Sequence, residues 1–243
     1  MSASGTRGVP RALWGLLAAG LCGIAAWWPV TTRQGVNGQV AVIRLPLWVK
    51  TAEFLIRDYH DRRLAHEIVR GVAHDQEKVM ALLAWTRAAL HPQPPDLPVV
   101  DDHVYSIIVR GYGAPDQFAD VLATLCVYAG IPAVRNRVTS AQGRRSLSLT
   151  LVRVEGRWCP IDPYHGVYFQ HPDGRLLSWP ELAEDPVLVR SAYRGPVAPP
   201  VEYGQFIRPG ISLSVESPRP SNQIPWVRVW QEITHMILAQ GRS

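Results

Sequence analysis

A run of 19 residues without a charged side chain, Ala12–Val30, constrains the fold of this chain most. As an α-helix it would be about 28 Å long, close to the ~30 Å hydrocarbon core of a bilayer. Arg7 and Arg11 precede the run, and Trp27 and Trp28 lie near its end, where an aromatic belt is expected. We therefore predict that this run is a transmembrane helix that anchors the chain.

The residues around the run predict its orientation and leave one alternative open. Two arginines precede it and one, Arg33, follows shortly after, which favours a cytoplasmic N-terminus. The alternative is a cleaved signal peptide, because Gly23-Ile24-Ala25 resembles a small-x-small cleavage site. Both interpretations place the rest of the chain at the cell envelope, in a periplasmic or other extracytoplasmic compartment.

The composition is that of a globular protein. Hydrophobic residues make up 47% of the 243 residues and charged residues 19%, which is enough apolar material for a core. The net charge of +5 comes from scattered arginines without a basic run, so no nucleic-acid partner is indicated. The three cysteines show no paired Cys or His spacing, and we expect neither a metal nor a cofactor. A disulfide between Cys126 and Cys159 stays open.

The hydrophobic periodicity after the apolar run predicts helices followed by strands. Helices are predicted at 48–72, 75–91 and 115–130, and strands at 133–139, 146–155, 157–161 and 166–170. Pro115 suits the first turn of its helix and Gly130 the end, while Glu155-Gly156 predicts a tight turn. The predicted organisation is a tail (1–11), the apolar segment (12–30), a linker (31–47), the domain (48–194) and a Pro-rich extension with an amphipathic helix (195–243).

Two segments carry a resemblance to a known family. The first is GAPDQFA, Gly113–Ala119, which is followed by DVLATLCVYAGIPAV; the second is VEGRWCPIDPYHG, Val154–Gly166. Together they resemble the core of the transglutaminase-like superfamily, over roughly residues 60–170. The resemblance implies an α+β fold with helices packed on a small antiparallel sheet. In this papain-like core a helix carries a nucleophilic Cys at its N-terminus. A His and an Asp on neighbouring strands complete the family's triad.

The resemblance also assigns the triad positions in this chain. The family has an Ala four residues after its Cys, and Ala119 in that role places the nucleophile at Pro115. The family's His lies about eleven residues before Trp158, at Leu147, and only the Asp is kept, as Asp162. Proline has no nucleophile and leucine no base, and a triad Asp serves to orient an imidazole. We therefore expect a degenerate, non-catalytic triad.

Cys159 and His165 are the candidate substitutes for the missing groups. Cys159 lies on a predicted strand, and His165 follows Asp162 by three residues, although a surface turn histidine is the simpler interpretation. Cys126 lies on the apolar stripe of the 115–130 helix and is predicted to be a core residue. The remaining titratable motifs are predicted to be solvated: Asp101-Asp102-His103 and His66-Glu67, which lacks the second His of a zinc protease motif.

Polar and aromatic groups near Pro115 are the candidates for ligand binding. Asp116 and Gln117 can hydrogen-bond a ligand, and Tyr112 and Tyr164 can stack on a sugar or an extended peptide. The alternative for Asp116 is that its negative charge stabilises the helix N-terminus, and the alternative for the tyrosines is that they pack in the core.

These features predict a membrane-tethered, non-catalytic transglutaminase-like domain at the bacterial cell envelope. It would bind a peptide, a glycan or a partner protein in the remnant cleft. One alternative is a cysteine-type hydrolase or acyl transferase that uses a displaced nucleophile. The other is a structural subunit of an envelope or polysaccharide-export complex, with contacts through the anchor and the C-terminal helix, whose apolar stripe includes Trp226 and Trp230. The resemblance fixes no substrate.

Overall fold

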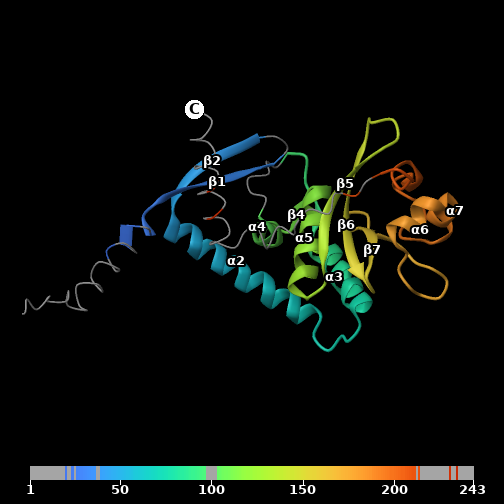
Figure 1. The fold of residues 1–243 in the computed structure, drawn as a ribbon, viewed down its shortest axis with the longest axis horizontal. Coiled ribbons are helices and arrows are strands. Elements are labelled where there is room, and N and C mark those ends of the chain that lie inside the picture. The colour runs from blue at the N-terminus through green and yellow to red at the C-terminus, as the bar shows by residue number, and fades with distance from the viewer. Residues whose placement is uncertain are drawn as a thin grey trace, which may run out of the picture.

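The computed structural model describes residues 20, 23–24, 26–36, 39–96, 103–211, 213, 230 and 234 (Figure 1). Among these residues no helix is both long and apolar enough to cross a bilayer. Most of the predicted anchor, Ala12–Val30, lies outside them, and its last two residues begin a β-strand. Most of the predicted C-terminal helix also lies outside, apart from Trp230 and Thr234, which are helical.

A β-hairpin opens the described part of the chain, where a linker was predicted at 31–47. Strand β1 (Pro29–Val36) pairs with β2 (Gln39–Pro46) in an antiparallel register from Pro29↔Pro46 to Val36↔Gln39. The Asn-Gly dipeptide between the two strands is a strong sequence signal for such a hairpin. Helix α2 (Leu47–Ile68) follows β2 directly, so the linker prediction is corrected to a structured element.

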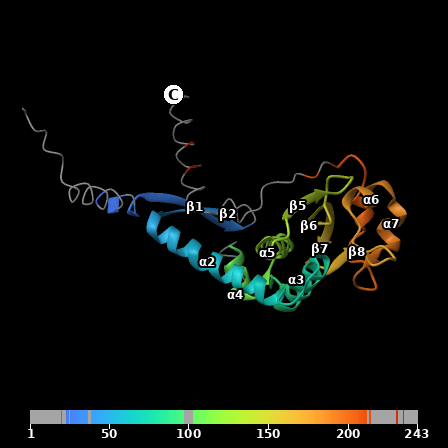
Figure 2. The same cartoon turned by 60° about the horizontal axis from the view of Figure 1, so that its bottom comes forward.

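Three further helices follow α2, and the last of them is central in the layer. These are α3 (Asp75–Ala89), the short α4 (Val104–Arg110), which was not predicted, and α5 (Pro115–Tyr128). Strands β3 (His91–Pro92) and β4 (Tyr112–Gly113) form a short parallel pair before α5. Helix α5 contacts α2, α3, α4 and the main sheet, and Figure 2 shows it enclosed between them. Every residue from 117 to 126 is buried, and the polar ones among them are Gln117, Asp120 and Thr124.

The main sheet is an antiparallel meander of five strands in sequence order. Its strands are β5 (Ala133–Thr139), β6 (Ser146–Val154), β7 (Arg157–Asp162), β8 (Val167–Phe169) and β9 (Tyr193–Arg194). The first four agree with the predicted strands, and the tight turn between β6 and β7 is confirmed. Both of its residues, Glu155 and Gly156, have positive φ, as a two-residue hairpin turn with the right twist requires.

Each face of the sheet has its own hydrophobic core. On one face Val152, Cys159 and Ile161 pack with α5; on the other, Leu147, Leu149 and Leu151 pack beneath short helices. The covering elements are α6 (Trp179–Glu184), α7 (Pro186–Ser191) and the 3₁₀-helix η1 (Tyr203–Gln205). The second core includes residues beyond the predicted domain end at 194, namely Tyr203, Phe206 and Ile207. The folded unit therefore continues into the segment predicted as an extension.

Candidate functional site

The N-terminus of α5 is where the resemblance places a nucleophile. Pro115 is the first residue of the helix and is exposed, with Ala114 as the N-cap. Proline suits this position because its fixed φ matches a helix and the first N–H groups of a helix have no partner inside it. The residue builds a regular helix start and supplies no reactive group.

The Gln117 side chain is used inside the fold. Its Oε1 accepts hydrogen bonds from the Ala114 N–H (3.0 Å) and from Arg110 Nη2 (2.9 Å). The residue is only 1% exposed, and its Nε2 is buried without a hydrogen-bond partner. The amide therefore caps the helix, and a ligand at the surface does not reach it in this arrangement.

Asp116 lies at the rim of the same helix terminus. Arg135 on β5 pairs with Asp116 (3.5 Å) and with the buried Asp120 (3.2 Å), which ties α5 to the sheet. The Asp116 side chain remains 38% exposed. Tyr112, which precedes α5, is partly buried under the Arg110 guanidinium, at 5.5 Å from its ring centroid. Ligand roles for Asp116 and Tyr112 stay predictions.

Asp162 at the end of β7 is the centre of a buried hydrogen-bonded group. Its side chain is 1% exposed and accepts a hydrogen bond from the His165 N–H (3.1 Å) and from the Tyr203 hydroxyl (2.8 Å). His165 Nδ1 lies 2.7 Å from Asp162 Oδ2. An imidazole held by a buried carboxylate is the arrangement that a catalytic triad uses to orient its base. Burial, together with the Asp162 charge, raises the pKa of Tyr203 above its ordinary range.

The turn that carries His165 is fixed by its neighbours. The Tyr164 ring packs edge-on against Phe118 of α5 and against the His165 ring, at centroid distances of 5.1 Å and 5.0 Å. Arg87 on α3 donates to the Tyr164 carbonyl and lies beside Gly166, where φ is +71° and a Cβ would meet the Arg87 Nε at 3.1 Å. His165 therefore lies in a turn packed on the N-terminal half of α5, and its ring keeps 24% exposure.

The predicted base position does not contribute a base. Leu147 on β6 is buried in the core on the α6 and α7 face of the sheet, together with Leu149. Thr150, the residue after Leu149, points to the α5 face of the sheet. Its hydroxyl donates to the Ala119 carbonyl of α5 at 3.0 Å. Asp162 lies on the Leu147 face, where Tyr203 joins it. The face of the sheet that holds the Asp162 carboxylate is thus lined by aliphatic and aromatic side chains.

Both described cysteines are buried, and no hydrogen bond joins either of them to His165 among the described residues. Cys159 packs in the core on the α5 face, whereas Asp162, three residues along β7, points to the other face. The Cys159 Sγ points to the carbonyls of Arg157 and Leu176, at 3.7 Å and 3.9 Å. Burial raises the pKa of the Cys159 thiol to about 11, and burial also raises the pKa of the Cys126 thiol. Both thiols are free, so the possible disulfide between them does not form.

Among the other titratable motifs, His66-Glu67 makes contacts within α2. Burial raises the pKa of the Asp61 carboxyl, and His103 lies close enough to lower it in part. His66 Nδ1 contacts the Arg62 carbonyl at 2.8 Å, and Glu67 pairs with Arg63 at 2.8 Å on the exposed side of α2. Asp101 and Asp102 lie outside the described residues. In the part of the chain that the structure describes, no three His, Cys, Asp or Glu side chains lie close enough to hold a metal ion.

A second polar cluster lies between α2, α4 and α5 and was missed in the sequence. Asp61 is 6% exposed, and it lines a cavity with Arg57, Asp58, Thr124 and Tyr128. The cavity has about 10 Å³ of free volume, room for about one water molecule. Burial raises the pKa of Asp61 to about 7, against the opposing effect of the nearby Arg57. Asp61 shares the buried side of α2 with Phe54 and Ala65, a pattern that could have signalled a buried carboxylate.

The comparison with known families agrees with this architecture. Residues 62–163 match the family model of the transglutaminase-like superfamily. This part of the chain is a transglutaminase-like domain. The match covers α3, α4, α5 and the sheet as far as β7, including both positions at which a nucleophile and a base are expected. No curated protein matches the chain at a significant level.

Several solved structures show weaker similarity. A protein from Cytophaga hutchinsonii, provisionally described as a cysteine protease, shares 17% identity over 47% of this chain and 42% of its own, with a TM-score of 0.39. A TGase shares 13% identity over 65% of this chain and 48% of its own, and LapG from Legionella pneumophila shares 12% over 61% and 78%, both with TM-scores of 0.36. The chain thus spans less than half of the first two proteins. At these values the similarities support no statement about activity.

Proposed function

We propose that this chain is a membrane-tethered transglutaminase-like domain that does no acyl-transfer chemistry and binds an extended ligand at the remnant cleft. The observation that carries the proposal is the separation of thiol and base. His165 is oriented by Asp162, yet the nucleophile position is Pro115, and the Sγ of the buried Cys159 points to the carbonyls of Arg157 and Leu176. A thiol activated by a histidine requires direct contact between the two groups.

The proposed binding region is the rim beside the α5 N-terminus. Asp116 remains partly exposed there, while Tyr164 and His165 present partly exposed rings from the turn after β7. These groups offer hydrogen bonding and flat apolar surface to a chain-like ligand. A peptide is the first candidate, because the superfamily resemblance implies chemistry on amides; a glycan or a partner protein is the alternative. Membrane tethering rests on the charge-free run Ala12–Val30.

A hydrolase with a displaced nucleophile is the second candidate. The Asp162–His165 pair favours it, because the Nδ1 contact orients the ring as in a general base. This function would require a nucleophile that reaches His165 Nε2, which Cys159 does not do from its buried position.

The test combines turnover with binding in the full-length protein, purified in detergent. Peptide amides, glutamine-containing peptides with amine acceptors, and oligosaccharides are presented in one panel. We expect no release of ammonia or peptide product, and we expect saturable binding of one ligand class. Asp116→Ala should weaken this binding by about tenfold. The control Asp173→Ala, on the exposed loop after β8, should leave the binding unchanged. Turnover that Cys159→Ala or His165→Ala abolishes would establish the hydrolase instead. Flotation of the full-length protein with vesicles tests the tether.

A further inference from the structure

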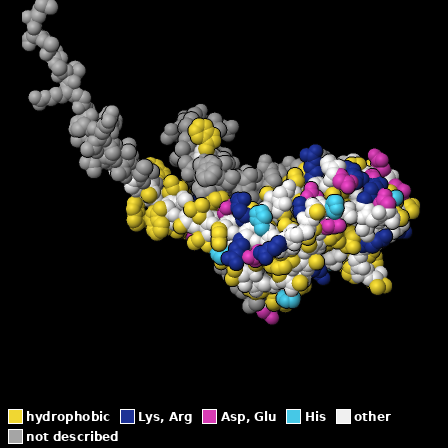
Figure 3. Space-filling view, turned by 90° about the horizontal axis from the view of Figure 1, so that it is seen from below, with side chains coloured by type: hydrophobic (Ala, Val, Ile, Leu, Met, Phe, Trp, Pro, Cys, Tyr) yellow, Lys and Arg dark blue, Asp and Glu magenta, His cyan; other side chains and the backbone are white. Residues whose placement is uncertain are grey.

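A surface of exposed aromatic and aliphatic side chains lies where the hairpin meets α2. We call it the aromatic surface; its residues are Trp27, Trp28, Trp48, Leu55, Ile56 and Tyr59. Each is between 48% and 68% exposed. Figure 3 shows hydrophobic side chains gathered at this end of the molecule. Soluble proteins rarely expose so many large apolar side chains side by side, so such a surface marks an interaction site.

Helix α2 presents this surface in addition to its core face. At 100° per residue, Trp48, Leu55 and Tyr59 lie within about 40° of one another around the helix. The buried Phe54 and Ala65 belong to a face about 120° away. The helix therefore has an apolar stripe that the domain does not cover among the described residues.

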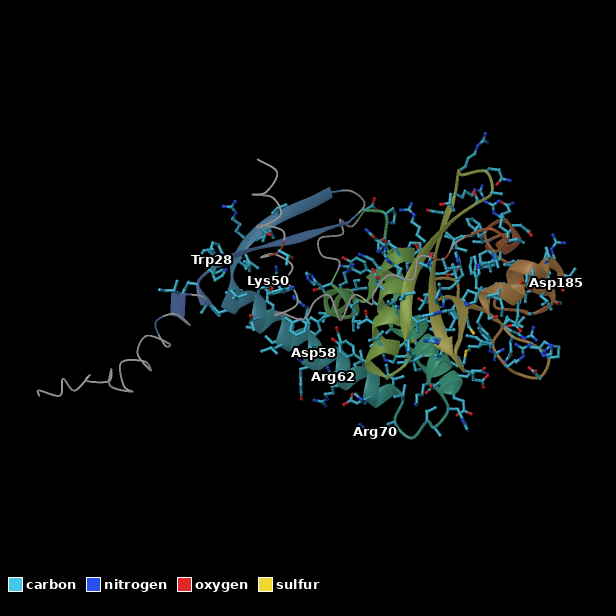
Figure 4. All side chains as sticks on the ribbon, viewed as in Figure 1. Trp28, Lys50, Asp58, Arg62, Arg70 and Asp185 are labelled. Atoms are coloured by element: carbon cyan, nitrogen blue, oxygen red, sulfur yellow. The ribbon has the colours of Figure 1, made fainter. Side chains whose placement is uncertain are left out.

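Contacts between the hairpin and the helix hold the surface together. The Trp27 ring packs edge-on against the Trp48 ring at 5.9 Å. The Leu47 N–H donates to the Trp28 carbonyl at 2.9 Å, and Lys50 Nζ donates to the Thr31 carbonyl at 2.6 Å. Figure 4 shows Trp28 and Lys50 side by side at the start of α2. The aromatic side chains are thus presented on a stable support.

The charge distribution indicates what covers the surface. The first 52 residues contain five basic residues and no Asp or Glu. Since the chain has 25 basic and 20 acidic residues, the other 191 residues carry 20 of each and no net charge. The whole formal excess of +5 therefore lies in the tail before the apolar run, the hairpin and the first turn of α2. A basic segment that carries the exposed Trp27, Trp28 and Trp48 complements an anionic lipid surface.

We propose that the aromatic surface lies in the headgroup region of a bilayer that contains anionic lipid, with α2 along the membrane plane. The contact rests on the proposed tether, because Trp27 and Trp28 lie near the end of Ala12–Val30. The aromatic rings enter the interface while Arg44, which is exposed on β2, faces the lipid phosphates. The domain is thereby held in one orientation on the membrane, with α6 and α7 at the far end (Figure 1).

The test places one fluorophore on each end of the full-length protein. Leu55→Cys labels the aromatic surface, and Val187→Cys on α7, 70% exposed, is the matched control; both are made with Cys22→Ser, and Cys126 and Cys159 are buried. The protein is reconstituted into phosphatidylcholine vesicles with phosphatidylglycerol and a nitroxide-labelled lipid. We expect about threefold quenching at position 55 and almost none at position 187, with less quenching when phosphatidylglycerol is omitted.

The outcomes separate the surface from the tether. Equal, weak quenching at both positions in protein that floats with the vesicles would overturn the surface contact and leave the tether in place. Protein that does not float would overturn both. Self-quenching between position-55 labels in detergent would show that a second copy covers the surface, which also overturns the proposal.

Discussion

Replacing Asp61 by Asn should change how the stability of the protein depends on pH. Asp61 is buried beside the cavity between α2 and α5, and its pKa rises from 3.8 to about 7. A carboxyl group whose folded pKa is raised stabilises the fold most below pH 3.8, and this stability is lost as pH rises towards 7. The whole loss corresponds to roughly 4 kcal/mol, at 1.36 kcal/mol per pKa unit. Asn has a similar shape and no charge, so it is not subject to this loss.

The measurement is urea unfolding of the full-length protein in detergent, followed by tryptophan fluorescence at several pH values. Between pH 5 and pH 7 the free energy of unfolding of Asp61→Asn should rise relative to wild type by about 2–3 kcal/mol. Asp75→Asn is the matched control, because this side chain on α3 is 55% exposed, and its difference from wild type should stay constant over the same interval. Parallel curves for wild type and Asp61→Asn would refute the assignment of a neutral, buried carboxyl group.

Two further substitutions test the packing of the candidate site. Tyr203→Phe removes a hydroxyl group that donates to the buried Asp162 carboxylate, and should lower the free energy of unfolding by about 1–3 kcal/mol. Tyr193→Phe, whose hydroxyl group bonds to an exposed carbonyl, should cost less than about 0.5 kcal/mol, and equal losses in thermal melts would contradict this view. Gln117→Ala removes the cap of α5 and leaves a small void, so it should cost about 2 kcal/mol by urea titration. An unchanged midpoint would mean that the buried amide does not support the helix start.

The sequence predicted those parts of the fold that rest on local signals. Pro115 and Gly130 marked the limits of α5, which runs to Tyr128, and Gly130 has the positive φ of a residue that follows a helix. Alternating apolar residues predicted β6 and β7, and Glu155-Gly156 forms the predicted turn. These elements are defined within a few residues of the chain, so periodicity and turn chemistry were sufficient.

A short helix, a hairpin and one long-range contact were missed. Helix α4 has only seven residues, which are too few for a reliable periodic pattern. It ends at Gly111, which has the left-handed backbone of a helix C-cap. The hairpin at Pro29–Pro46 was hidden by the long apolar run before it, although Asn37-Gly38 was a usable signal. Tyr203 joins Asp162 across 41 residues, and nothing in a single sequence indicates such a contact.

The candidate site was predicted in its positions and less well in its geometry. The triad role of Asp162 stays a prediction. His165 Nδ1 contacts the Asp162 carboxylate, although the simpler interpretation was a surface histidine. Gln117 was predicted to face a ligand, whereas its amide caps α5. Which face a strand residue occupies follows from alternation, but which of the two faces meets α5 depends on packing that one sequence does not define.

The central claim is that no described thiol is poised for catalysis, and alkylation of the native protein tests it most directly. Full-length protein is treated with iodoacetamide from pH 6 to pH 10, and labelling at Cys159 is measured by mass spectrometry beside His165→Ala and a urea-unfolded control. Because burial raises the pKa of Cys159 to about 11, labelling of the folded protein should be at least about a hundredfold slower than in urea and unaffected by His165→Ala. Fast labelling at pH 7 that depends on His165 would contradict the account, because it would reveal an activated thiol next to the imidazole.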